Sequence, residues 1–125
     1  MVKYIHSDEG RLLDLPGRKS LETVSGNICN SNCTVRLVEI PVPNINDKPR
    51  TPHCHIDFEE CIYVMSGRGM GFVNGEENPV EEGDTVLIEP GEWHYFRNVG
   101  NQPLKLLCFF PVGDSSDGTM NLKPE

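Results

Sequence analysis

The stretch HCHIDFEECIYVMSG, residues 53–67, carries the strongest structural signal in this chain. One residue separates His53 from His55, and Glu60 follows after residues 56–59. A third histidine, His94, lies downstream at the end of Pro90-Gly91-Glu92-Trp93-His94. Neutral imidazoles combined with a carboxylate are ligand types that bind divalent transition metals. The pattern therefore predicts a metal site, but it does not indicate a reaction.

Strand geometry supports the convergence of the first two histidines and places a condition on Glu60. Successive side chains of a strand point to opposite faces, so His53 and His55 share a face, about 6.5 to 7 Å apart. Glu60 has the opposite parity, so it joins the site only if a turn within residues 56–59 resets the alternation. His94 must come from a third strand. We expect three strand segments of one barrel wall to supply the ligands.

Short β-rich runs separated by turn signals indicate the fold class. The chain has 12 glycines and 10 prolines, which leave few windows long enough for an average helix. Asn74-Gly75 is a strong two-residue hairpin signal. Many short strands with frequent turns predict an all-β sandwich or barrel. The predicted strands cover residues 34–40, 61–65, 71–73, 85–88, 93–97 and 104–110.

Length and composition narrow the organisation and the partners. A chain of 125 residues fits a single domain. We expect an N-terminal arm over residues 1–33, a barrel over about 34–111 and a loose, polar C-terminal tail over 112–125. A net charge of −8 argues against nucleic acid or an anionic membrane as a partner. Neither a signal peptide nor a run of ~20 apolar residues is seen, so we expect a cytoplasmic protein.

The cysteines do not suggest a disulfide framework. Their number is odd, at 5, and no secretory signal precedes them. Cys29 and Cys33 lack the Cys-x2-Cys spacing of metal and redox motifs, so a functional role for this pair is a minor hypothesis.

Two segments resemble the motifs of a known family. Residues 53–67 resemble the first cupin motif, and residues 83–98 resemble the second, with its closing His94. The resemblance spans about residues 34–111 and is typical of small single-domain bacterial cupins of the RmlC-like, conserved-barrel (cupin 2) type. Asp47 stands where the family pattern often has Gly, and Glu89 where it often has Pro; both departures lie in turns.

The resemblance has structural and functional implications. It implies an antiparallel jelly-roll barrel, also called a double-stranded β-helix, that usually forms a homodimer. It also implies one divalent transition metal, which can be Fe, Mn, Ni, Zn or Co. The implied metal ligands are His53, His55, Glu60 and His94.

The donor set leaves coordination positions open, and its single carboxylate leaves the site net positive. The site should therefore attract a small oxygen-rich or carboxylate ligand. No second inward carboxylate is evident, which favours a metalloenzyme with oxygenase-like or metal-enolate chemistry, in which the metal centre is itself the catalytic group. Dioxygenase, decarboxylase or lyase, and isomerase activities stay open. The alternatives are a non-catalytic metal or small-ligand-binding module and a sugar or keto-acid isomerase.

Strand parity also selects candidates for the substrate pocket. Phe96 and Asn98 share the face of His94, and Met70 and Phe72 share one face of their strand. Arg36 can face either way, since each face of its strand carries one charged residue; if inward, it could bind a substrate carboxylate. Core packing is the simpler explanation of the apolar alternation, because that alternation needs no ligand to explain it. The pocket candidates are Arg36, Met70, Phe72, Phe96 and Asn98.

Overall fold

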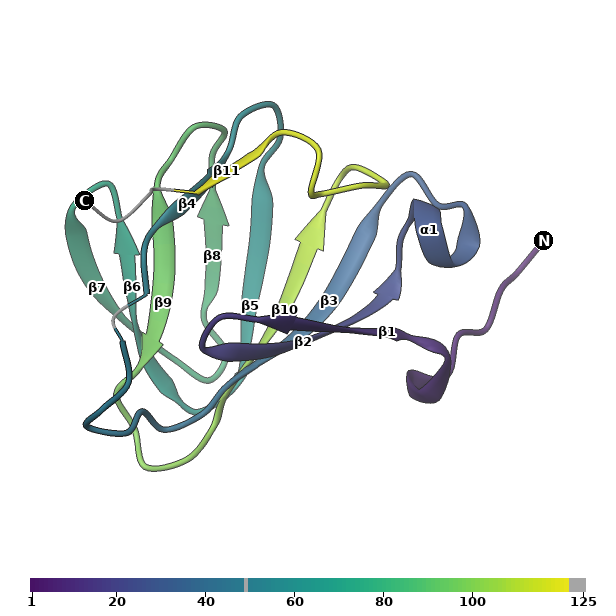
Figure 1. Ribbon diagram of the computed structural model, residues 1–125. Coiled ribbons are helices and arrows are strands. Elements are labelled where there is room, and N and C mark those ends of the chain that lie inside the picture. Colours follow the sequence, from purple (N-terminus) through teal and green to yellow (C-terminus); the bar gives the residue numbers. More distant parts are fainter. Residues whose placement is uncertain (49, 122–125) are drawn as a thin grey trace.

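The computed structural model describes residues 1–48 and 50–121, which form two antiparallel sheets facing each other (Figure 1). The six-stranded sheet has the order β1-β2-β3-β10-β5-β8, and the five-stranded sheet has the order β11-β4-β9-β6-β7. The prediction of an antiparallel all-β barrel is confirmed. The strands are β1 (Arg11–Leu15), β2 (Arg18–Val24), β3 (Thr34–Ile40), β4 (His53–His55), β5 (Glu60–Ser66), β6 (Arg68–Val73), β7 (Glu76–Glu81), β8 (Thr85–Ile88), β9 (His94–Asn98), β10 (Leu104–Phe110) and β11 (Thr119–Asn121).

In the described residues, helical structure consists of two single turns near the N-terminus. A 3-10 turn, η1, covers Ser7–Glu9, and α1 covers Gly26–Cys29. The Ser25 side chain accepts a hydrogen bond from the Ile28 amide and caps α1, as expected of an N-terminal serine. Within the described ranges, no helix is both long and apolar enough to cross a membrane.

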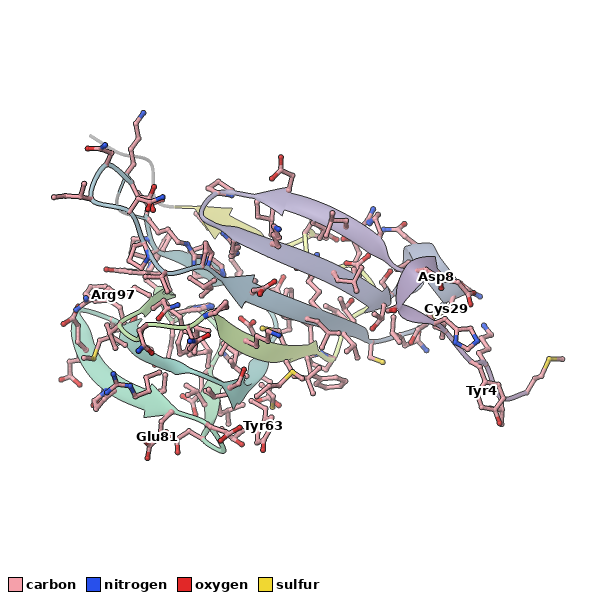
Figure 2. All side chains as sticks on the ribbon, turned by 90° about the horizontal axis from the view of Figure 1, so that it is seen from below. Tyr4, Asp8, Cys29, Tyr63, Glu81 and Arg97 are labelled. Atoms are coloured by element: carbon pink, nitrogen blue, oxygen red, sulfur yellow. The ribbon has the colours of Figure 1, made fainter. Side chains whose placement is uncertain are left out.

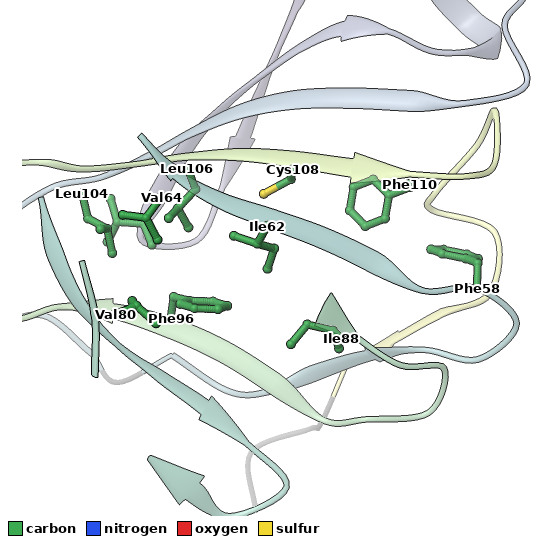
Figure 3. Packing of buried hydrophobic residues seen from close by; sticks show 11 residues of the cluster. Phe58, Ile62, Val64, Val80, Ile88, Phe96, Leu104, Leu106, Cys108 and Phe110 are labelled. Atoms are coloured by element: carbon green, nitrogen blue, oxygen red, sulfur yellow. The ribbon is translucent and has the colours of Figure 1, made fainter. Parts of the chain in front are cut away.

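Alternating side chains from both sheets fill the space between them. On β10 the buried residues are Leu104, Leu106, Cys108 and Phe110, as the sequence pattern predicts. Figure 3 shows these side chains above Val80, Ile88 and Phe96, which come from other strands. The β6–β7 hairpin turns at Asn74 and Gly75, whose φ values of 49° and 88° match the predicted two-residue turn.

Both ends of the chain contribute strands that the sequence pattern did not indicate. The region expected to be an arm forms the β1–β2 hairpin, which extends the six-stranded sheet by pairing with β3. The region expected to be a loose tail includes β11, which pairs with β4 so that Thr119 lies opposite His55. These two additions decide what surrounds the candidate site.

Candidate metal centre

Four side chains converge between the two sheets. His53 and His55 come from β4, and His94 opens the neighbouring β9, where it pairs with His53. Glu60 opens β5 in the opposite sheet. One ligand atom of each residue lies within 4.8 Å of those of all the others. The sequence therefore identified the residues that the fold brings together.

The expectation that one wall supplies all the ligands is corrected. The backbone bends at Ile56 and Asp57, so the predicted turn is present, and β5 then begins in the other sheet. Strand alternation ends where a chain changes sheets, so the parity of Glu60 relative to His55 no longer matters. Glu60 thus approaches the histidines from across the barrel.

A hydrogen-bond chain orients His55. The Thr119 hydroxyl donates to the carbonyl of Ser115, so its oxygen is free to accept the Nδ1–H of His55, at 2.8 Å. Nε2 of His55 is then unprotonated and lies 3.2 Å from Oε1 of Glu60. The imidazole is held in the tautomer that can bind a metal through Nε2.

His94 is oriented in the same way by the backbone. Its Nδ1–H donates to the carbonyl of Glu92 at 2.8 Å, because that oxygen can only accept. Nε2 of His94 therefore presents a lone pair to Oε1 of Glu60, 3.0 Å away. Two acceptors at this separation repel each other unless a cation or a proton lies between them.

The donor set and its spacing fit a divalent transition metal. Two metal–ligand bonds of ~2.1 Å at a right angle would place their donor atoms about 3.0 Å apart. The separations of 3.0 and 3.2 Å from Glu60 to the two Nε2 atoms agree with that value. Three imidazoles and one carboxylate also suit Mn, Fe, Co, Ni and Zn, so the geometry selects no single element.

The protonation states of two of the four side chains favour cation binding. Burial alone would raise the pKa of Glu60, but hydrogen bonds that the His55 and His94 imidazoles donate when a proton takes the place of the cation outweigh burial and lower that pKa to about 2. Burial, followed by the charge of His94, lowers the pKa of His53 to about 3. At neutral pH Glu60 is therefore ionised and His53 is neutral, as metal ligands must be.

A cavity of about 480 Å³ opens beside the four side chains. Its apolar wall includes Ile62, Leu106 and Phe110 from the six-stranded sheet, and Phe96 from the five-stranded sheet. Four guanidinium groups also line it, belonging to Arg11, Arg18, Arg36 and Arg50. A pocket of this kind combines apolar walls with a few placed polar groups, as small-molecule sites do.

Comparison with known proteins places the chain in a family. A family model described as "Cupin domain" matches residues 45–110, more than half of the chain. The chain belongs to the cupin family. The expectation drawn from residues 53–67 and 83–98 is thereby confirmed.

Two curated relatives and one solved structure resemble this cupin. An uncharacterised protein of Methanocaldococcus jannaschii is 43% identical over 56 residues, which cover 45% of each chain. The oxalate-binding protein of Thermotoga maritima is 34% identical over 56 residues, covering 45% of this chain and 46% of that protein. Each match thus spans less than half of the relative's length. A structure of Streptomyces PAC13 with uridine superposes with a TM-score of 0.79 at 15% identity, covering 98% of this chain and 93% of that one. At that identity the likeness shows the shared fold.

The open question about Arg36 is resolved, since its side chain faces the cavity of this cupin. Its guanidinium lies over the Phe110 ring, 5.6 Å from the centroid, and bonds to Glu22 at 3.0 Å. Glu22 is only 2% exposed and also binds Arg11, at 2.8 Å. The charge of Arg36 is therefore already partnered by a buried carboxylate of the protein.

The other pocket candidates divide into one that lines the cavity and three that do not. Phe96 forms part of the wall. Asn98 is buried, but its amide donates to the carbonyls of Ile40 and Gln102, linking the end of β3 to the β9–β10 loop rather than lining the cavity. Met70 and Phe72 also lie outside the cavity lining, and Phe72 packs against Tyr95, with ring centroids 5.0 Å apart.

Glycines explain why Met70 and Phe72 point away. Gly69 and Gly71 occupy the inward face of β6 and are buried. A Cβ on Gly69 would lie 2.6 Å from Cδ2 of Leu104, and one on Gly71 would lie 3.0 Å from Phe96. The large neighbours fill this side of the barrel, so the small residues of the alternation face inward.

Sequence reasoning missed the polar lining that comes from the N-terminal hairpin. Arg18, Ser20 and Glu22 alternate along β2 and share its inward face, a pattern that resembles the exposed face of an edge strand. Arg50 lies in a proline-rich loop three positions before His53. That short spacing from a metal-ligand candidate was the only signal available for it.

Proposed function

We propose that this cupin is a small metalloenzyme that acts on a small, oxygen-rich carboxylate substrate. The observation that carries the proposal is the juxtaposition of a three-histidine, one-glutamate cluster with an arginine-lined cavity. The name of the Thermotoga maritima relative, an oxalate-binding protein, supports a small carboxylate as the ligand.

In this proposal, different residues of the chain bind the metal, orient its ligands and exclude water. His53, His55, Glu60 and His94 would hold one divalent metal, with His55 and His94 oriented through their Nδ1 atoms. When bound, that metal supplies Lewis-acid polarisation of a substrate oxygen or, if it is redox-active, oxygen chemistry. The apolar wall excludes water, which strengthens the electrostatic attraction between the cationic lining and an anionic substrate.

The small number of carboxylates in the cavity favours chemistry centred on the metal. Among the described residues that line the cavity, Glu60 is the one carboxylate, and the buried Glu22 is held by two arginines. Hydrolysis or isomerisation with a dedicated acid and base would need another inward group. Decarboxylation and oxygenation next to a carboxylate need fewer acid and base side chains in the cavity. A non-catalytic carboxylate-binding module is the second candidate, favoured by the name of the same relative, an oxalate-binding protein.

Elemental analysis of purified protein tests the metal site. We expect about one transition-metal ion per chain, retained on dialysis or regained when Mn²⁺, Fe²⁺, Co²⁺, Ni²⁺ or Zn²⁺ is added. His53→Ala should lose it while circular dichroism shows an unchanged β-sheet signal. His6→Ala is the matched control, since His6 is exposed and distant in sequence from the site. The proposal is wrong if the wild type binds no metal.

A substrate screen separates the two candidates. Oxygen uptake and carbon dioxide release would be followed with small mono- and dicarboxylates on the metal-loaded protein. Turnover that His53→Ala abolishes identifies an enzyme. Saturable carboxylate binding without turnover identifies the binding module.

We also propose a homodimer, formed through the outer face of the six-stranded sheet. Tyr63, Met65, Leu87 and Phe109 are large apolar residues exposed on this face. Tyr63 points outward in Figure 2. An exposed apolar patch on a sheet is a common site of protein association.

A further inference from the structure

Two of the four cavity arginines have no acidic partner among the residues that the structure describes. Arg11 and Arg36 both bind Glu22. Within residues 1–48 and 50–121, neither Arg18 nor Arg50 forms an ion pair with a carboxylate. Their only side-chain hydrogen bonds in these ranges go to backbone carbonyls, from Arg18 to Pro16 at 3.0 Å and from Arg50 to Phe96 at 3.1 Å. Most of the donors of both guanidinium groups are therefore free to bind a ligand.

The β1–β2 turn brings these two arginines together. Gly17 immediately precedes Arg18 and has a φ of +71°. A Cβ on Gly17 would lie 3.2 Å from Cδ of Arg50, so the Arg50 side chain passes directly over the turn. Both side chains line the same cavity as the four metal-ligand candidates.

Placing two like charges in a partly dehydrated cavity is unfavourable without a counter-charge. Burial, followed by the charge of Arg18, lowers the pKa of Arg50 to about 10. An arginine still carries its charge at neutral pH under those conditions. An anion between the two guanidinium groups would remove the repulsion and use their free donors.

Two buried hydroxyls in the same cavity also have no hydrogen-bond partner among the described residues. Ser20 and Ser115 are 0% and 3% exposed, and within the described part of the chain neither Oγ has a hydrogen-bond partner. Ser20 lies two positions from Arg18 on the inward face of β2. Buried polar atoms are rarely left unsatisfied, so these hydroxyls also point to a polar ligand.

We infer that Arg18 and Arg50 form a subsite for a second anionic group of the substrate, separate from the oxygen group that approaches the metal centre. The substrate is then a small molecule with an anionic group, carboxylate or phosphate, at each of its two ends, called a dianion below for its two anionic groups. This inference rests on the proposed function. Arg50 lies within residues 45–110, the part matched by the cupin model, and Arg18 lies outside it, so this chain's N-terminal hairpin supplies one half of the subsite.

Calorimetric titration with matched probes tests the subsite. Acetate has one carboxylate, succinate has two, and phosphoglycolate replaces one carboxylate with a phosphate. We expect the metal-loaded wild type to bind one or both dianions about 10- to 100-fold more tightly than acetate, as expected for added charge-assisted hydrogen bonds. The preferred dianion identifies the second group as carboxylate or phosphate.

Variants of Arg18 and Arg50 test whether these two residues cause the preference for dianions over acetate. Arg18→Gln should remove most of the dianion advantage and change acetate affinity by less than about 3-fold, because acetate would bind only at the metal. Arg50→Gln should act in the same direction. Arg18→Lys keeps the charge without the planar fork and should retain part of the advantage. Arg97→Gln is the matched control, since the Arg97 side chain, labelled in Figure 2, is 49% exposed and its ion pair is with Glu77 of β7.

The outcomes separate this inference from the proposed function. If metal binds but the wild type shows no dianion preference, the subsite is wrong and the metal centre stands. The same conclusion follows if Arg18→Gln weakens acetate and dianions equally. If the protein binds no metal but the chelator-treated form still binds dianions through Arg18, the subsite stands and the proposed metalloenzyme fails. If Arg18→Lys folds and binds dianions as tightly as the wild type, positive charge alone accounts for the preference. The planar guanidinium group of Arg18 would then have no specific role.

Discussion

His53 shows how a single residue can link folding to metal binding. It lies among the other ligand candidates, with its ring 4.3 Å from that of His94 between centroids. Burial lowers its pKa from 6.5 to about 3, so the folded protein holds it neutral under conditions where an unfolded chain would protonate it. As the pH falls from 6.5 towards 3, the unfolded state therefore binds more protons than the folded state. Stability must fall across that window.

We predict that the metal-free protein loses stability on mild acidification because of His53. The urea midpoint, measured in the presence of a chelator, should fall between pH 7.5 and pH 5 (chosen to span the ordinary histidine pKa of about 6.5). His53→Gln should show a shallower pH dependence, and His6→Gln should match the wild type. Identical slopes for wild type and His53→Gln would contradict the assignment.

At the scale of elements, regular alternation was predictable from sequence and chain crossings were not. His53 and His55 share a face because β4 is an ordinary strand, and β10 buries every second residue for the same reason. The position of Glu60 depends on the chain leaving one sheet for the other at residues 56–59, which alternation cannot describe. On β6 the largest side chains were expected inside, but Leu104 and Phe96 already fill that space. Packing between strands distant in sequence decided that orientation.

Strand β11 is the element with the least sequence signal and a direct connection to the site. It is short, and it follows a polar segment rich in Ser, Asp and Gly. Its pairing with β4 places Thr119 against Nδ1 of His55. Partners of this kind fix the tautomer and direction of a metal-binding imidazole.

We predict that Thr119→Val weakens metal binding about 10- to 100-fold, the usual effect of losing such a partner. Valine keeps the side-chain shape but removes the oxygen that accepts the proton of His55. Affinity would be measured by competition with a chromogenic chelator. Thr85→Val, at an exposed position on β8, should leave it unchanged. An unaltered dissociation constant in Thr119→Val would show that His55 does not depend on this hydrogen bond.

The whole molecule separates its charges by location. The chain carries a net charge of −8, yet the described residues that line the cavity include four arginines and one carboxylate. An acidic exterior keeps the protein soluble and disfavours polyanions such as nucleic acid. Under the proposed function, the cationic cavity would attract anions that are small enough to enter. Size and charge together therefore restrict the ligand more than either one does alone.

The outer face of the six-stranded sheet exposes several large apolar side chains. Strand pairing places Leu87 beside Cys61, and Cys61 beside Phe109, so apolar side chains run across β8, β5 and β10. Leu87 is 52% exposed and Phe109 39%. A second copy presenting the same face would cover both patches, as twofold dimers do.

We predict that the protein is a dimer, with about twice the 14.0 kDa mass of the chain in sedimentation or light-scattering measurements. Leu87→Lys combined with Phe109→Lys should give a folded monomer, because pairing would then bury four lysines against each other. Ile45→Lys is the control, since this fully exposed residue lies in the loop after β3. A monomeric wild type, or a dimer that survives both lysines, would exclude this face as the interface.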